Sequence, residues 1–238
     1  MSRRVALTLT ALLLATATAA TACGPAPEKK PAAAPSTSAP SPSATKLTDP
    51  EMFAMTKRAL LPEDALAEIS FPGTSKPASE QVYQGMLIDC TPGLTTDALI
   101  TGRTARVWPT TQGKWALSAA FGFQETTAAQ VIEEIRKTVP AKCRGWKSTE
   151  PEPDRSVDFS SEVALTELPG TTASYGYCQT LTFLPSRIQV SSCVVFVGYK
   201  AAGMDMVGAF HYAVENEAIA KATVAQFAPK IAEQLAKA

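Results

Sequence analysis

Residues 175–194 read YGYCQTLTFLPSRIQVSSCV, two segments of alternating apolar and polar side chains separated by Pro185-Ser186. Alternation with a period of two is typical of a strand with one buried face, so each segment is expected to form a β-strand. A turn centred on the Pro-Ser pair would match apolar with apolar and polar with polar residues along the ladder. Gln179, opposite Ser192, would be the one polar interruption of the buried face. The stretch therefore predicts an antiparallel hairpin.

The same register places Cys178 directly opposite Cys193. Directly opposed residues of an antiparallel pair have Cα atoms roughly 4.5 to 5.5 Å apart, a separation that a disulfide tolerates. The chain has five cysteines, Cys23, Cys90, Cys143, Cys178 and Cys193. With Cys23 set apart near the N-terminus, a second disulfide between Cys90 and Cys143 follows by elimination. Four reduced, buried thiols are the alternative, and the export signal described next argues against them.

Residues 1–22 have the composition of a secretory signal peptide. Arg3 and Arg4 provide a positive start, and residues 5–22 are uncharged and mostly apolar or small. Ala20-Thr21-Ala22 fits the small-x-small pattern that a signal peptidase accepts. The segment is too short and too weakly flanked to be a stable membrane span, so export with cleavage before Cys23 is expected.

Cys23 is predicted to carry a lipid, because the residues before it resemble a bacterial lipobox with Ala20 where leucine is usual. Residues 23–46 consist mainly of Pro, Ala, Ser and Thr, which cannot bury enough apolar surface to fold, so they are expected to form a disordered tether. A tether is useful between a bilayer and a folded domain, and a lipid would remove the unpaired fifth thiol. Secretion with cleavage at the same bond and no lipid is the alternative.

Residues 47–238 predict a single α+β extracytoplasmic domain. Helices are expected over residues 49–60, over residues 127–140 after a capping box, and after the cap Asn216, with a kink or break at Pro229. Besides the hairpin, strands are expected over residues 82–90, 103–110, 114–124, 157–165 and 204–214. Strands that follow one another without a helix between them are antiparallel. The predicted fold class is an antiparallel sheet with helices packed on one face and two disulfides.

The chain carries none of the usual sequence motifs of a catalytic, cofactor or metal site. His211 is the only histidine, so zinc would lack ligands and a Ser-His-Asp triad would lack a recognisable serine. The adjacent Glu133 and Glu134 would point about 100° apart on a helix, as on a solvated face. The formal net charge of zero gives no indication of nucleic-acid binding. No catalytic residue, cofactor, metal or nucleic-acid partner is therefore expected.

Aromatic side chains provide a candidate ligand groove. They are Trp108, Trp115, Phe121, Phe123 and Trp146. Aromatic residues at strand and helix positions also fill protein cores, and this is the alternative interpretation.

Several short motifs carry a family resemblance. They are the lipobox-like start, the segment ALLPEDALAEI at residues 59–69, Asp89-Cys90, Phe121 and Phe123, the capped middle helix, Cys143 near Trp146, and the Cys178/Cys193 pair. This layout resembles actinobacterial lipoproteins whose domain is similar to the extracellular sensor domain of mycobacterial receptor Ser/Thr kinases. The resemblance implies two disulfides, a twisted sheet with helices and a ligand cleft. The chain departs from the family pattern in one respect, because Cys143 precedes Trp146 where the resemblance implies a tryptophan before the cysteine.

The leading hypothesis is a non-enzymatic ligand-binding or sensor-like lipoprotein on the extracytoplasmic face of the cell membrane. Its expected partners are the membrane, through lipid on Cys23, and a small hydrophobic or cell-wall ligand. The chain contains no kinase domain, so any sensing would need a partner protein of the envelope. An envelope hydrolase that uses His211, and a structural or interaction protein of the envelope, are the alternatives.

Overall fold

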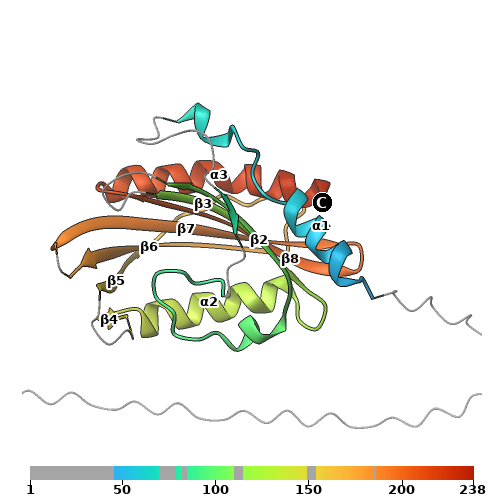
Figure 1. The fold of residues 1–238 in the computed structure, drawn as a ribbon, viewed down its shortest axis with the longest axis horizontal. Helices are drawn as coiled ribbons and strands as arrows, with labels where there is room; N and C mark the ends of the chain where they lie inside the picture. The colour runs from blue at the N-terminus through green and yellow to red at the C-terminus, as the bar shows by residue number, and fades with distance from the viewer. Residues whose placement is uncertain (1–45, 70–78, 82–84, 110–114, 149–153, 185) are drawn as a thin grey trace, which may run out of the picture. The chain divides into compact units, whose positions relative to one another are not determined.

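The computed structural model describes residues 46–69, 79–81, 85–109, 115–148, 154–184 and 186–238. These residues belong to one structural unit and form a single antiparallel sheet with helices on both of its faces (Figure 1). The predicted signal peptide, Cys23 and all of the predicted tether except Lys46 lie outside the described residues.

Within the described ranges the sheet has eight strands in the order β1-β2-β3-β8-β7-β6-β5-β4, and all neighbours are antiparallel. The strands are β1 (Ser79–Gln81), β2 (Ile100–Pro109), β3 (Trp115–Phe123), β4 (Trp146–Lys147), β5 (Arg155–Glu162), β6 (Ala173–Phe183), β7 (Ile188–Ala201) and β8 (Met204–Val214). The strands β7 and β8 occupy the middle of the sheet. The predicted α+β class with an antiparallel sheet is confirmed.

The β6–β7 hairpin has the predicted register along its whole length. Phe183 lies opposite Ile188 next to the turn, and Cys178 lies opposite Cys193. The two cysteines form a disulfide, and their Cα atoms are 4.0 Å apart. Pro185, at the predicted turn, lies outside the described residues. Matching of apolar and polar faces was therefore sufficient to fix this register.

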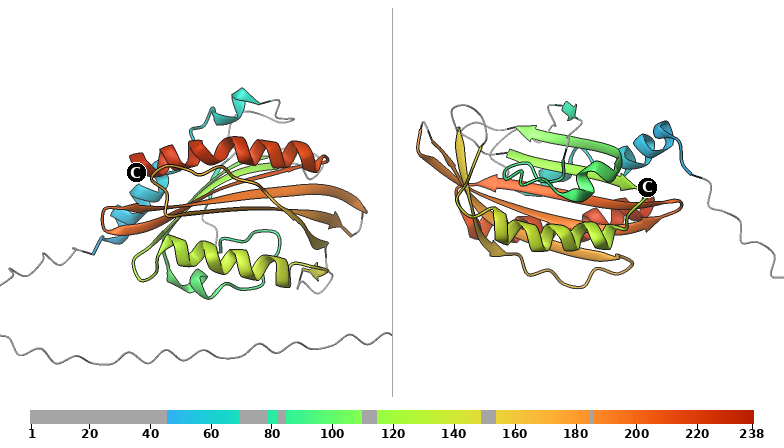
Figure 2. Two further views of the ribbon diagram at one scale, coloured as in Figure 1. Left: turned by 180° about the vertical axis from the view of Figure 1, so that it is seen from behind. Right: turned by 90° about the horizontal axis from the view of Figure 1, so that it is seen from below.

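The helices cover both faces of the sheet. They are α1 (Asp49–Arg58), α2 (Ala128–Lys142), α3 (Glu217–Lys237) and the 3-10 helices η1 (Ala65–Glu68) and η2 (Thr95–Leu99). Helix α2 packs on one face, and α1 and α3 pack on the other, as Figure 1 and the rear view in Figure 2 both show. The expectation that all helices pack on one face is wrong.

Coverage of both faces follows from the composition of β7. Val194 and Phe196 pack into the core on the α2 side, whereas Val195 and Val197 pack into the core on the α3 side. A continuous apolar run is typical of a strand buried on both faces, and residues 193–197 read CVVFV. Apolar and polar residues alternate clearly only near the turn of the hairpin, and only there does the sequence indicate a strand with one buried face.

Close contact between α3 and the sheet depends on a glycine in β8. A Cβ atom at Gly208 would lie 2.5 Å from Ile231 Cγ2 and 3.2 Å from Leu235 Cδ1. Separations this short are not possible between carbon atoms without movement of a neighbour. Gly208 therefore sets the distance between α3 and β8.

The helix ends follow the predicted capping residues. Thr127 Oγ1 accepts a hydrogen bond from Gln130 N at 3.2 Å, and Thr127 N donates to Gln130 Oε1 at 3.1 Å, so the capping box is confirmed. Asn216 Oδ1 caps α3 by accepting from Ile219 N at 3.1 Å.

Two helices extend past a proline, so the end expected at residue 140 is passed and the break considered at Pro229 is absent. Helix α2 continues past Pro140 to Lys142, and α3 runs through Pro229 as one continuous helix. Pro229 lies on the exposed side of α3, so water can hydrate the carbonyl of Ala225 that loses its backbone partner. None of the described helices is long and apolar enough to cross a membrane.

Candidate functional site

The five aromatic residues of the candidate groove are not brought together. Trp108 is fully buried on the α3 face of the sheet. Phe121 and Phe123 are fully buried on the opposite face, where Trp115 and Trp146 are partly buried against the same core. The expected aromatic groove is corrected: alternation along β2 and β3 sends these rings into two separate cores, where they pack as interior residues.

A different feature covers the α2 face, the segment Gly85–Leu99, called the strap below. The strand predicted over residues 82–90 is wrong over residues 85–90, which contain bends and no strand, and residues 82–84 lie outside the described residues. The strap packs its apolar side chains into the α2-side core through Met86, Leu87, Cys90 and Leu94. The predicted disulfide between Cys90 and Cys143 is present and joins the strap to the C-terminal end of α2.

A buried carboxylate fixes the strap to the hairpin. Asp89, 2% exposed, accepts hydrogen bonds at Oδ2 from Gln179 Nε2 and from Ser192 Oγ, both at 2.8 Å. Burial raises the pKa of Asp89, and the bond from Ser192, the charge of Arg155 and the bond from Gln179 oppose this increase. Gln179 and Ser192, the polar pair on the apolar face of the hairpin, thus bind the strap through Asp89.

Asp89 was not identified as a site residue from the sequence. The available signal was the pair Gln179 and Ser192 on an otherwise apolar face, because buried polar side chains need partners. That signal indicates that a partner exists but does not say which residue provides it.

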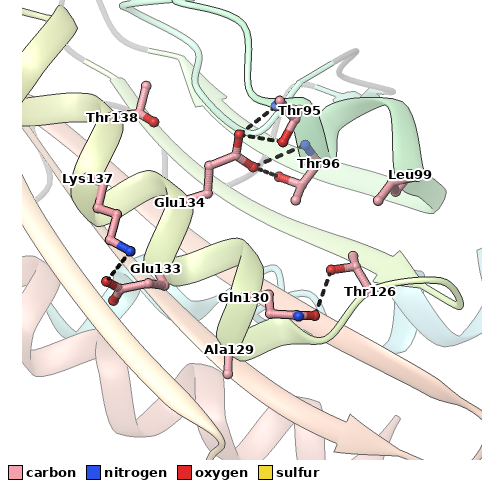
Figure 3. A pocket seen from close by; sticks show the side chains of 10 residues that line it. All are labelled: Thr95, Thr96, Leu99, Thr126, Ala129, Gln130, Glu133, Glu134, Lys137 and Thr138. Atoms are coloured by element: carbon pink, nitrogen blue, oxygen red, sulfur yellow. Dashed lines mark hydrogen bonds and ion pairs between the residues drawn. The ribbon is translucent and has the colours of Figure 1, made fainter.

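A second carboxylate ties the strap to the middle of α2. Glu134 accepts four hydrogen bonds, from the backbone N and the Oγ1 of both Thr95 and Thr96, at 2.6 to 3.1 Å (Figure 3). Burial disfavours the charge of Glu134, but these four hydrogen bonds together outweigh burial and lower its pKa. The side chain caps the N-terminus of η2 and is not free to bind anything else.

Between η2 and α2 lies an open groove of about 770 Å³, called the strap groove below (Figure 3). Its lining residues are Thr95, Thr96, Leu99, Thr126, Ala129, Gln130, Glu133, Glu134, Lys137 and Thr138. At its rim, Lys137 Nζ lies 3.2 Å from Glu133 Oε1, one helical turn earlier. Hydroxyl, amide and charged groups thus face a single depression whose two walls are joined by Glu134.

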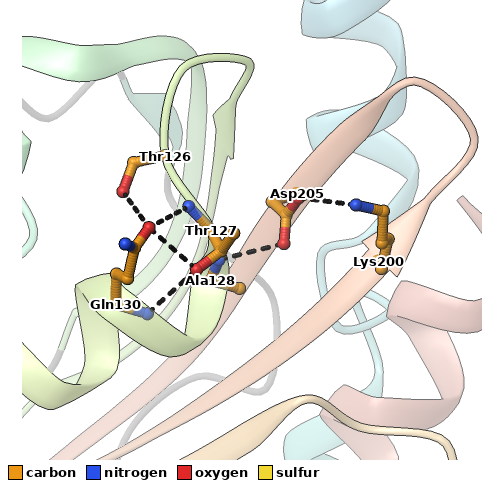
Figure 4. A network of polar contacts seen from close by, with 6 residues as sticks. All are labelled: Thr126, Thr127, Ala128, Gln130, Lys200 and Asp205. Atoms are coloured by element: carbon orange, nitrogen blue, oxygen red, sulfur yellow. Dashed lines mark hydrogen bonds and ion pairs between the residues drawn. The ribbon is translucent and has the colours of Figure 1, made fainter. Parts of the chain in front are cut away.

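The N-terminal end of α2, at the other end of the groove wall, is fixed to the sheet (Figure 4). Asp205 in β8 accepts a hydrogen bond from Ala128 N at 3.0 Å and lies 3.6 Å from Lys200 Nζ. Gln130 Oε1 accepts from Thr126 Oγ1 at 3.2 Å. An acidic group at the first turn of a helix is stabilising. These contacts hold the α2 wall of the strap groove rigidly on the sheet.

His211 is buried in the sheet and not placed at any surface. It is 1% exposed, stacks on Trp115 with ring centroids 5.6 Å apart and meets Phe196 edge-on at 6.0 Å. Neither ring nitrogen has a hydrogen-bond partner among the described residues, and burial lowers the pKa of His211 to about 3. A neutral imidazole enclosed by aromatic rings cannot exchange protons with a substrate in solution.

The described residues bring no three His, Cys, Asp or Glu side chains close enough to hold a metal ion. The strap groove carries one cation and one anion at its rim, Lys137 and Glu133.

Comparisons with known proteins add one similarity. No protein-family model matches the chain, and no curated protein matches it significantly. Among solved structures, the chain is similar to the extracellular domain of PknH from Mycobacterium tuberculosis, at 14% sequence identity and a TM-score of 0.44. The similarity covers 82% of this chain and 100% of that chain.

Proposed function

We propose that this protein is a membrane-anchored, extracytoplasmic binding protein and not an enzyme. Residues 1–22 would direct export, Cys23 would carry the lipid, and residues 23–46 would tether the domain. The two disulfides, Cys90–Cys143 and Cys178–Cys193, support a location outside the cytoplasm, because disulfides persist in oxidising compartments.

The strap groove is the observation that carries the binding role. Eight of the ten lining residues are polar or charged, but most of the surface that they present to the groove is made of apolar atoms. Such a mixed lining suits a cell-wall component that carries both polar groups and small apolar groups. An envelope hydrolase that relies on His211 is not supported, since that ring is buried in the sheet.

Binding in the groove is tested by filling it. Thr138 lines the groove on α2 and is only partly buried, so Thr138→Trp should block the depression without disturbing the core. Ala67→Trp is the matched control, because Ala67 lines a separate depression between η1 and α3. The full chain is heated with and without a soluble peptidoglycan digest, and the change in Tm is measured.

The digest should raise the Tm of the wild type and of Ala67→Trp, and should leave the Tm of Thr138→Trp unchanged. An equal increase in Thr138→Trp would mean that binding occurs elsewhere. The anchor is tested separately by the intact mass of membrane-extracted protein before and after reduction. A chain that begins at Met1, or at Cys23 without added lipid mass, would contradict the proposed anchoring.

A further inference from the structure

We propose that the strap groove takes a short zwitterionic peptide and not a glycan, an inference that rests on the binding role proposed above. Among the described residues that line the groove, none is aromatic. A sugar ring presents a flat apolar face that packs best on an aromatic side chain, whereas a peptide needs hydrogen bonds, small apolar contacts and charge at its ends.

The two ends of a peptide have matching charges at the rim. Glu133 Oε1 and Lys137 Nζ are 3.2 Å apart, and their side chains are 49% and 74% exposed. An exposed ion pair contributes little to stability, so exchanging it for contacts with a ligand is inexpensive. Glu133 would then bind the peptide ammonium group and Lys137 the peptide carboxylate.

Glu133 is the only carboxylate of the lining that is available for an ammonium group. Both oxygens of Glu134 are occupied by Thr95 and Thr96. Among the described residues, Glu133 pairs with the exposed Lys137 and, at 3.8 Å, with Arg136, which also donates to Ser174 O and lies over the ring of Tyr175. Glu133 would therefore be the one residue that binds the positive end of a ligand, and its replacement should strongly weaken peptide binding.

The dimensions of the site favour a short peptide. Three extended residues span about 10 Å. Glu133 and Lys137 are one turn apart on α2, about 6 Å along the axis, and the flexible four-carbon stem of lysine supplies the remaining reach. Ala129 and Gln130, one turn before Glu133, and Thr138, next to Lys137, also line the groove, and their methyl and amide groups suit small side chains and a peptide backbone.

The experiment is an amide chemical-shift titration of the full chain with three probes. Trialanine carries both terminal charges, N-acetyl-trialanine amide has the same side chains and neither charge, and chitotriose is a neutral glycan. Trialanine should shift the amides of Thr95, Thr96 and Lys137, and the blocked peptide should bind at least about tenfold more weakly.

Two variants test separately how the ammonium end and the carboxylate end of the ligand contribute to binding. Glu133→Gln and Lys137→Gln should each weaken trialanine binding about tenfold. Glu233→Gln is the matched control, because Glu233 and Lys237 form an equivalent exposed i,i+4 pair on α3, 2.6 Å apart. That control should bind trialanine as well as the wild type does.

Equal binding of free and blocked peptide, or no effect of Glu133→Gln, would overturn the zwitterion inference. Binding of chitotriose alone to the groove would also overturn it, but would leave the proposed binding function intact. If no probe shifts the groove amides while the peptidoglycan digest still stabilises the wild type and not Thr138→Trp, the inference fails alone. If the digest has no effect either, the binding function fails as well.

Discussion

Replacement of His211 by phenylalanine should make the folded domain less sensitive to acid. His211 is the only histidine of the chain, and in the folded state it is a buried neutral ring between Trp115 and Phe196. Phenylalanine keeps a flat ring in this aromatic contact and removes the two ring nitrogens, which have no partners. The substitution therefore changes proton binding while it preserves the shape of the core.

The magnitude follows from the difference in pKa between the unfolded and folded states. The pKa of His211 is about 3 in the folded domain, against about 6.5 in an unfolded chain. Between these values the unfolded state binds the proton and the folded state does not, so the free energy of unfolding falls as the pH falls. Between pH 7 and about pH 4.5 the loss due to His211 amounts to about 2.5 kcal/mol.

The buried carboxylate of Asp89 acts in the opposite sense. Asp89 has a raised pKa in the folded state, so its contribution favours folding at low pH and diminishes as the pH rises. This contribution is the same in wild type and variant, because the variant retains Asp89 with its partners Gln179 and Ser192. It therefore cancels when the two proteins are compared.

The assay is urea denaturation of wild type and His211→Phe at pH 7 and about pH 4.5, with both disulfides intact. The wild type should lose about 2.5 kcal/mol more stability on acidification than the variant does. His211→Leu serves as a second variant in case phenylalanine is too large for the site. Equal losses in the wild type and both variants would refute the assignment of a neutral, buried imidazole.

Three further predictions concern the strap and the α3 contact. Asp89→Ala should lower the free energy of unfolding by about 2 to 4 kcal/mol, because Gln179 and Ser192 lose their buried acceptor. Asp89→Asn should lower it less, and equal unfolding curves for Asp89→Ala and the wild type would contradict this prediction. Glu134→Ala should speed amide hydrogen exchange at Thr95 and Thr96 at least about tenfold, whereas Glu133→Gln should not. Unchanged exchange in Glu134→Ala would show that Glu134 does not hold the strap. Gly208→Ala should destabilise the domain by about 1 to 3 kcal/mol in urea denaturation, because the added Cβ meets Ile231; an unchanged midpoint would mean that α3 adjusts without strain.

The predictability of the fold depended on whether a pattern was local. The hairpin register, the Cys178–Cys193 pair and the cap at Thr127 were predictable because neighbouring residues along the chain determine them. Coverage of both faces was not, because alternation near the hairpin turn masked the continuous apolar run of residues 193–197.

The candidate site was much less predictable. The strap has no periodicity, since its conformation is set by contacts with residues far away in the sequence, such as Asp89 with Gln179 and Thr95 with Glu134. The aromatic residues gave a misleading signal because strand alternation alone does not say which of two cores a ring enters. A groove between a loop and a helix arises only once both are placed.

The two disulfides also have a consequence for how the chain reaches its destination. They close segments with sequence separations of 15 and 53 residues, and by loop entropy they contribute about 3 and 4 kcal/mol to stability. In a reducing cytosol neither bond forms, and a domain of ordinary stability, about 5 to 15 kcal/mol, loses a large part of it. For the export proposed above, the lower stability of the reduced chain would make unfolding for translocation easier, and oxidation after translocation would restore the full stability of the domain.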